Sequence, residues 1–331
     1  MHAPDQRFEA LLETQPEEFA RQLLRSLKLP EKPLSASNGW SNQVWLAPAH
    51  VVRFSSGRFR DSFAHERDTL QLLPSGFPHA PVRGYGRVGR REWLVQDRVP
   101  GRPLGEAWPA LNTTQRRSAI TQLGEALQIL HTIPLPAGFD NPWLTDAIGP
   151  HGQRGDAYHI APKHYRLLLD AASLVPGTER SVLEECGTFV NERLAFFAED
   201  SPVLVHCDLH FANLLWEEGC LMAILDFEGA RPAPADMELD TLLRFAREPW
   251  LYQGPTMDTE PTRTRIPGVP LWLAEAYPAL FAHQRLAARL AVYEALWQLV
   301  QLLHFPPGSG FPDPYGHLKK LLNAGDTWSP Y

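Results

Sequence analysis

Cysteine is scarce in this chain of 331 residues, and the three that occur, Cys186, Cys207 and Cys220, form no CxxC pair. A sparse, odd-numbered set argues against a disulfide-stabilised scaffold. Long apolar runs are also missing, because no stretch approaches the roughly 18 apolar residues that a membrane-spanning helix needs. The first residues are acidic and polar, unlike a signal peptide. We therefore expect a cytoplasmic protein with no membrane partner.

An excess of positive charge is missing too. The formal net charge is −7, whereas binding to a phosphate backbone needs clustered Lys and Arg, so we expect no nucleic-acid partner. The charge is uneven along the chain: residues 1–100 hold 14 basic and 11 acidic side chains, and residues 101–331 hold 17 basic and 27 acidic ones. The acidic groups are therefore concentrated in the second part.

Patterns of apolar residues divide the chain into two parts. Between residues 34 and 99, short β-rich runs alternate with turn residues, which indicates an antiparallel sheet. Beyond a Pro- and Gly-rich connector at 100–105 the apolar spacing is helical, apart from a strand-rich island at 203–227. We expect an α+β fold, with a small N-terminal lobe of residues 1–99 and a larger, mainly helical C-terminal lobe of residues 100–331.

Three helices of this prediction can be placed closely. One covers about 14–28, with Thr14 as its N-cap and Glu17 completing a capping box. A second, about 60–73, interrupts the sheet region and carries Glu66 on its apolar face. A third and much longer helix is expected near 271–303.

Polar residues stand at the ends of apolar runs in the strand-rich island. Asn213 precedes one short strand and Asp226 ends the next, with the turn Glu217-Glu218-Gly219 between them. A hairpin would bring Asn213 and Asp226 together at its open end, and such oxygen ligands suit Mg²⁺. Asp208 lies in the loop that enters this hairpin, where it can reach a substrate hydroxyl. The alternative is that these residues only cap turns and end a strand.

A zinc site is a second possibility, because His206, Cys207, Asp208 and His210 are all zinc-binding residue types. A structural zinc site usually takes its ligands from two loops, and neighbours in an extended segment point in opposite directions. We therefore favour the oxygen-ligand hypothesis over a zinc-dependent hydrolase, and expect His206 and His210 to shape the loop that holds Asp208.

The segment HCDLHFAN (206–213), followed 13 residues later by Asp226-Phe227, resembles the signature of the aminoglycoside phosphotransferase family, relatives of the protein kinases. The resemblance implies a protein-kinase-like fold of two lobes with the nucleotide between them, and transfer of the γ-phosphoryl group of ATP to a hydroxyl of a small molecule. It implies that Asp208 is the catalytic base and that Asn213 and Asp226 hold Mg²⁺ on the nucleotide phosphates. Cys207 stands where members commonly have Gly, and Glu228 replaces the Gly of the protein-kinase Asp-Phe-Gly triplet.

An ion pair is expected in the first part of the chain. Glu66 interrupts an apolar stripe, and a buried carboxylate needs a cation. Arg53, at the end of the run HVVRF, is the natural candidate. The resemblance assigns this pair to the α- and β-phosphates of the nucleotide, although a purely structural bridge would satisfy the same burial argument.

The resemblance also implies two further nucleotide contacts. Ser37, Asn38 and Gly39 would belong to a loop that covers the phosphates, although the same residues suit an ordinary hairpin loop. Asp97 to Val99 would form the hinge between the lobes, whose backbone binds adenine.

Support for the catalytic loop and the acceptor site falls in the C-terminal part. Asp240, or alternatively Asp236, would hold the catalytic loop together with His206, as the resemblance implies. The acidic charge and the aromatic residues of this part suit a cationic or sugar-like acceptor. A non-catalytic, kinase-like binding module is the alternative, but Asp208, Asn213 and Asp226 are all present, which favours an enzyme.

Overall fold

The chain folds into two compact units in this computed structural model, the first made of Met1–Ala110 with Ala212–Gly229 and the second of Leu111–Phe211 with Ala230–Tyr331. The structure describes residues 4–38, 42–55, 62–140, 162–198, 200–249, 266, 268–310, 312–325 and 328–329. The segment 212–229 packs with the N-terminal residues, whereas its position in the sequence suggested the C-terminal lobe. The backbone N–H of Ile224 donates to the carbonyl of Pro78 at 2.8 Å, which ties this segment to the first unit.

A five-stranded antiparallel sheet forms the centre of the first unit, in the order β1-β2-β3-β5-β4. The strands are β1 (Ser35–Asn38), β2 (Gln43–Leu46), β3 (His50–Phe54), β4 (Val82–Val88) and β5 (Arg91–Asp97). The predicted antiparallel sheet is confirmed. Strand β1 was not predicted, because its small polar residues carry no strand signal and only pairing with β2 holds them extended.

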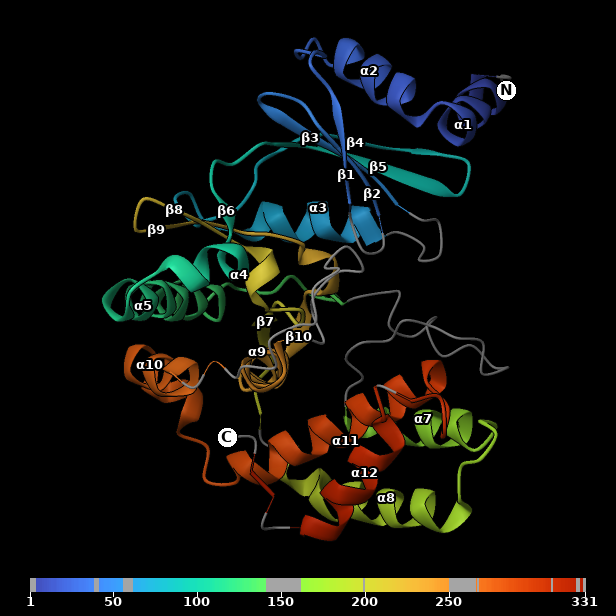
Figure 1. The fold of residues 1–331 in the computed structure, drawn as a ribbon, viewed down its shortest axis with the longest axis vertical. Coiled ribbons are helices and arrows are strands. Elements are labelled where there is room, and N and C mark those ends of the chain that lie inside the picture. The colour runs from blue at the N-terminus through green and yellow to red at the C-terminus, as the bar shows by residue number, and fades with distance from the viewer. Residues whose placement is uncertain are drawn as a thin grey trace. The chain divides into compact units, whose positions relative to one another are not determined.

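Helices cover both faces of this sheet, and strand β3 shows how the faces differ. Val52 and Phe54 are fully buried in a cluster with α1 (Pro4–Thr14) and α2 (Pro16–Ser26). Arg53 points to the other face, because successive side chains of a strand alternate, and meets α3 (Ser62–Leu72) there. Figure 1 shows α2 and α3 on the two sides of the sheet.

A second, three-stranded sheet belongs to the same unit. Its order is β6-β8-β9, and it consists of β6 (Arg102–Pro103), β8 (Leu214–Glu217) and β9 (Cys220–Ile224). The rings of Phe77 and Phe227 pack edge to face at 6.2 Å, so the chain after β9 is anchored beside the loop that follows α3. The short helix α4 (Leu104–Ala107) and the 3₁₀ turn η1 (Trp108–Ala110) complete this part of the first unit.

The second unit is mainly helical. Its α-helices are α5 (Thr113–Leu130), α7 (Tyr165–Ala172), α8 (Arg180–Arg193), α9 (Met237–Arg247), α10 (Gly268–Ala276), α11 (Leu286–His304) and α12 (Pro314–Ala324). Its 3₁₀ turns are η2 (Pro162–His164), η3 (Leu194–Phe197) and η7 (Pro278–Phe281), and η4 (Phe211–Asn213) and η5 (Phe227–Gly229) lie at the junctions with the first unit. Residues from α7, α8, α11 and α12 form one buried apolar cluster, visible in Figure 1 as adjacent helices. The strands β7 (Val203–Val205) and β10 (Arg231–Ala233) pair antiparallel.

Two helix predictions were wrong in their limits. Thr14 does not begin a helix; it ends α1, with its hydroxyl donating to the carbonyl of Ala10 at 2.7 Å, and Gln15 precedes α2. The helix expected near 271–303 is two helices, because the residue before a proline disfavours the helical conformation and Tyr277 precedes Pro278. Among the described helices, none is long and apolar enough to cross a membrane.

The packing of α2 on the sheet predicts a large loss of stability for Phe19→Ala. Phe19 is 1% exposed and its ring lies 5.4 Å from that of Phe54, so removing it leaves a cavity that costs about 3–5 kcal/mol. The free energy of unfolding in urea measures this. Glu13→Ala, at an exposed helix position, should change it by less than about 0.5 kcal/mol. Equal effects of the two substitutions would contradict the assignment of Phe19 to the core.

Candidate active site

The predicted hairpin is present, and it brings Asn213 and Asp226 to its open end. Leu214 pairs with Ile224 across β8 and β9, and one residue further out the N–H of Leu225 donates to the carbonyl of Asn213 at 2.8 Å. Asn213 closes η4, and Asp226 follows directly on Leu225. Two oxygen-bearing side chains therefore flank the same pair of strand ends.

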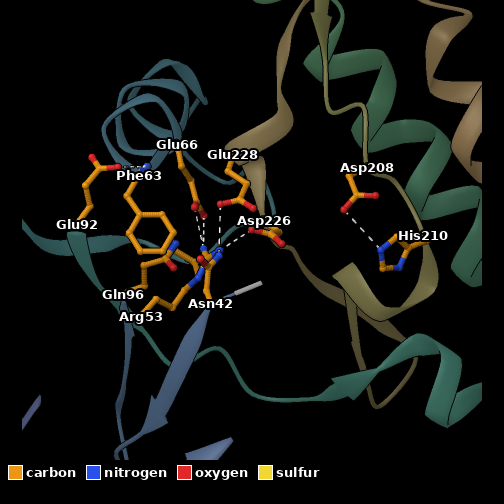
Figure 2. Close-up of polar contacts among 11 residues, drawn as sticks. Asn42, Arg53, Phe63, Glu66, Glu92, Gln96, Asp208, His210, Asp226 and Glu228 are labelled. Carbon is orange, nitrogen blue, oxygen red and sulfur yellow. Dashed lines mark hydrogen bonds and ion pairs between the residues drawn. The ribbon is translucent and has the colours of Figure 1, made fainter. Parts of the chain in front are cut away.

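Arg53 connects the sheet, α3 and this hairpin through its guanidinium group. One nitrogen lies 2.6 and 2.8 Å from the two carboxylate oxygens of Glu66, and another lies 2.5 Å from Oδ1 of Asp226. The ring of Phe63 lies 4.8 Å from the guanidinium carbon. Figure 2 shows Arg53 with Glu66, Asp226 and Glu228 around its charged end. The expected pair of Arg53 with Glu66 therefore exists, and it extends to Asp226.

Three carboxylates surround this single cation. Glu66, Asp226 and Glu228 each present an oxygen within 4.8 Å of the others. Burial raises the pKa of Glu66 against the lowering effect of Arg53, and burial together with the charge of Asp226 raises the pKa of Glu228 well above its ordinary value. Burial works to lower the pKa of Arg53, but these carboxylates raise it, so the guanidinium stays charged. Three ionised carboxylates would carry more negative charge than Arg53 neutralises, and the raised pKa values show that the cluster retains protons to reduce this surplus.

A divalent metal ion fits this donor set. Carboxylate and amide oxygens are the ligands that Mg²⁺ accepts, and one or two carboxylates suffice when phosphates supply the remainder. Asp226 has a φ of +67°, a left-handed conformation that is uncommon for residues other than glycine. Glu228 was named in the sequence only as a departure from the protein-kinase triplet. Its position two residues after Asp226 is the one feature of the sequence that could have indicated its place in the carboxylate cluster.

Asp208 lies in the second unit, on the loop between β7 and η4. Its side chain is 41% exposed, and its Oδ2 lies 3.6 Å from Nε2 of His210, as Figure 2 shows. The backbone N–H of Asp208 points to Nδ1 of His206 at 3.2 Å. Both histidines therefore contact the loop around Asp208, and the carboxylate remains accessible to a substrate.

The backbone at Cys207 adopts a conformation that suits the glycine commonly found at this position of the family pattern. Cys207 has a φ of +69°, in the left-handed region that favours glycine, and its side chain is 2% exposed. Burial raises the pKa of its thiol to about 12, so the sulfur stays protonated and is a poor zinc ligand. Among the described residues, the segment 206–210 forms no group of three converging metal ligands, which argues against the zinc hypothesis.

Glu238, which the sequence did not single out, contacts the loop that precedes Asp208. Its Oε1 accepts a hydrogen bond from the backbone N–H of His206. Asp236 pairs with Arg289 at 2.6 and 2.8 Å, and Asp240 pairs with Arg244 one turn along α9. Support of the loop by Asp240 or Asp236 stays a prediction, while the contact through Glu238 is observed.

The other nucleotide-binding predictions are placed only in part. Ser37 lies in β1, the side chain of Asn38 and all of Gly39 fall outside the described residues, and Val99 follows the end of β5. The N–H of Asp97 already donates to the carbonyl of Pro81 at 2.8 Å. The carboxylate of Asp97 binds Arg83, whose hydrogen bond lowers the pKa of that carboxyl. A hinge contact with adenine would therefore have to use other backbone groups than this amide.

Comparison with protein families assigns the chain. The sequence profile of the Phosphotransferase enzyme family matches residues 34–265, which include both the Arg53 cluster and the Asp208 loop. The chain belongs to this family. It is a phosphotransferase that uses an alcohol group as acceptor, and its acceptor is a small molecule. No curated protein sequence matches the chain significantly.

Solved structures agree on the fold. The ADP-bound aminoglycoside phosphotransferase APH(2'')-Ib matches with a TM-score of 0.60 and 16% identity, over 95% of this chain and 98% of that one. A mutant of APH(4)-Ia with AMP-PNP and hygromycin B matches with a TM-score of 0.60 and 18% sequence identity, over 93% of this chain and 97% of that one. The streptomycin-ATP complex of APH(2'')-IIa matches with a TM-score of 0.61 and 16% sequence identity, over 93% of this chain and 96% of that one. The phosphotransferase's kinase-like fold, predicted from the resemblance, is therefore confirmed.

The surplus of negative charge predicts how stability depends on pH. Because the folded protein holds the pKa of Glu228 above the ordinary 4.5, the folded state binds more protons than the unfolded chain above that pH. The free energy of unfolding should therefore fall as the pH rises, by up to about 1.4 kcal/mol per pH unit for one proton. Glu228→Gln, which has no such proton, should raise the free energy of unfolding at pH 8 and flatten the slope.

Urea denaturation of the metal-free protein between pH 5 and 8 measures both effects. Glu217→Gln serves as the matched control, because Glu217 is an exposed residue of the same hairpin. If Glu228→Gln and Glu217→Gln both show the same dependence of the free energy of unfolding on pH as the unsubstituted protein, the pKa of Glu228 is not raised in the folded state.

Proposed function

We propose that the protein transfers the γ-phosphoryl group of ATP, with Mg²⁺, to a hydroxyl of a small cationic or sugar-like molecule. The observation that carries the proposal is the bridge of Arg53 between Glu66 and Asp226, because it joins a cation suited to phosphates with a carboxylate suited to a metal ion. A cytoplasmic location, where ATP is made and the three cysteines stay reduced, forms part of the proposal.

Each residue of the first unit has a defined task in this proposal. Arg53, held in place by Glu66, binds the α- and β-phosphates of the nucleotide, since a guanidinium offers parallel donors to phosphate oxygens. Asp226 and the amide oxygen of Asn213 would hold Mg²⁺. When bound, Mg²⁺ would supply positive charge to neutralise the negative charge that develops on the phosphates. The surplus of carboxylate charge around Arg53 supports this assignment.

Asp208 accepts the proton of the acceptor hydroxyl and aligns its oxygen for attack. Its carboxylate is partly exposed, and the contact with His210 limits its orientation. Catalysis of phosphoryl transfer rests mainly on positioning and on electrostatic stabilisation, so a carboxylate held in one orientation is the feature that the reaction needs.

The acceptor class rests on charge and on the ligands of similar proteins. Hygromycin B and streptomycin are bound to the APH(4)-Ia and APH(2'')-IIa structures, and both proteins share the fold of this chain at 16–18% identity. Residues 101–331 hold 27 acidic against 17 basic side chains, and such an excess of negative charge attracts cations. An amine-bearing or hydroxyl-rich acceptor agrees with both observations.

Two substitutions should separate catalysis from nucleotide binding. Asp208→Asn is expected to lower turnover by about 10²–10⁴-fold, because the proton acceptor is lost, and to leave the affinity for Mg-ADP unchanged. Asp226→Ala should instead weaken Mg-ADP binding, because a metal ligand is lost. Turnover of ATP and calorimetric titration with Mg-ADP measure the two quantities. Asp170→Asn, at an exposed position of α7, is the control, and near-normal turnover by Asp208→Asn would refute the role of Asp208.

The acceptor class predicts a selective response in a panel of alcohols. With Mg-ATP, hygromycin B, streptomycin, gentamicin and choline-like amines should support faster ADP release than uncharged sugars or simple alcohols, because the acidic part of the chain favours cations. A coupled assay for ADP measures the rates. Phosphorylation of uncharged alcohols alone would discard the cationic acceptor and keep the phosphotransferase.

A further inference from the structure

The backbone just before Asp208 is held in a conformation that its own residue disfavours. Cys207 has a φ of +69°, and for a residue other than glycine the left-handed region costs roughly 1–2 kcal/mol. Such a conformation persists only where the surroundings over-determine it. The contacts on each side of Cys207 therefore have to supply the compensating energy.

Helix α9 makes two contacts with this loop from one face. The Oε1 of Glu238 accepts from the N–H of His206, and the hydroxyl of Thr241 donates to the carbonyl of Cys207 at 3.0 Å. Glu238 and Thr241 are three residues apart, so their side chains lie on the same side of the helix. Both are buried, at 1% and 2% exposure, where hydrogen bonds are costly to leave unmade. The two contacts bracket the peptide unit between His206 and Cys207.

A histidine lies beside Glu238, and a tyrosine contacts that histidine. Nε2 of His131 lies 3.7 Å from Oε1 of Glu238, and Nδ1 of the same ring lies 3.2 Å from the hydroxyl of Tyr277. Burial and the charge of Glu238 raise the pKa of Tyr277, so its hydroxyl keeps its proton and is able to donate to Nδ1. With that tautomer the N–H on Nε2 faces Oε1 of Glu238, the oxygen that also accepts from His206, at a distance too long for a hydrogen bond. His131 therefore places a polar group beside the buried carboxylate.

We propose that Glu238 and Thr241 clamp the backbone of His206 and Cys207 and thereby hold Asp208 in its catalytic orientation. His131 lies beside Glu238 in this arrangement. The inference rests on the proposed role of Asp208, and it makes Glu238 and Thr241 positioning residues, since they act through the loop and touch no substrate. A glycine at position 207 would need less of this restraint, because it adopts a positive φ freely.

A double-mutant cycle tests the clamp. Thr241→Val removes the donor while keeping the shape of the side chain. It should lower kcat by about 10–100-fold, as a displaced catalytic group does, and leave the KM for Mg-ATP unchanged. Cys207→Gly alone supplies the reference kcat for the second background. In the Cys207→Gly background, Thr241→Val should cost at least about fivefold less in kcat than it costs alone, because the relaxed backbone no longer needs the hydrogen bond.

Two further variants control the cycle. Thr241→Ser keeps the hydroxyl and should restore kcat. Thr69→Val alters a fully buried threonine whose hydroxyl has no hydrogen-bond partner among the described residues, and should leave kcat unchanged. Turnover is followed as consumption of Mg-ATP with the best acceptor of the panel, or with water as acceptor when no alcohol is phosphorylated.

Hydrogen exchange provides a readout that does not depend on activity. Amides of the peptide covering 203–211 should exchange faster in Thr241→Val than in the unsubstituted protein. Unchanged exchange in Thr241→Val, or an equal loss of kcat in both backgrounds, would overturn the clamp. Faster exchange in a protein that shows no ATP turnover at all would instead keep the clamp and refute the proposed function.

Discussion

The first unit depends on the placement of one guanidinium group. Arg53 is fixed by strand β3, whose alternation sends Val52 and Phe54 into the apolar cluster with α1 and α2 and leaves Arg53 facing α3. Its side chain is 11% exposed, and Glu66 is fully buried. Without Arg53 the buried carboxylate of Glu66 would lose the counter-charge that the structure shows, which is strongly destabilising. The same electrostatic need therefore holds the sheet, α3 and the hairpin together.

Strained backbone recurs at two of the candidate site residues. Asp226 itself has a φ of +67°, and Cys207, directly before Asp208, has one of +69°. In both places neighbouring groups supply the compensation: Arg53 binds the Asp226 carboxylate, and Glu238 and Thr241 bind the backbone around Cys207. Strain of this kind is typical of sites where a side chain must be aimed in one direction. At position 207 the side chain is also buried, so the cysteine contributes packing that a glycine would not.

Local patterns in the sequence were sufficient for much of the fold. The alternating runs predicted the strands β2 to β5, and the turn residues between two polar-ended runs predicted the β8–β9 hairpin, because strand alternation and turn chemistry act over a few residues. The limits of the long predicted helix near 271–303 were wrong where Pro278 interrupts it, although the apolar spacing continues beyond it. Strand β1 was missed because only its partner β2 stabilises it.

The candidate site also contains some residues that local sequence patterns predicted and others that they did not. Glu66 was predicted to need a cation because one charged residue interrupted an apolar stripe, and Arg53 was its nearest candidate. Glu238 was missed because an acidic residue in a helix usually faces solvent, and nothing in its neighbours indicates that the loop 206–208 packs on it. Asp226 was recognised from its spacing, but its contact with Arg53, 173 positions away, has no local signature.

The sequence by itself therefore determined the type of each element, the family and the identity of the polar residues at strand ends, because periodicity and motif spacing are local properties. The tertiary structure alone decided which charges meet. It placed three carboxylates around Arg53, assigned the hairpin to the first unit, and put Glu238 against the backbone of His206. The physical reason is that electrostatic contacts and buried hydrogen bonds form between segments distant in the chain, and only the packed core sets their distances.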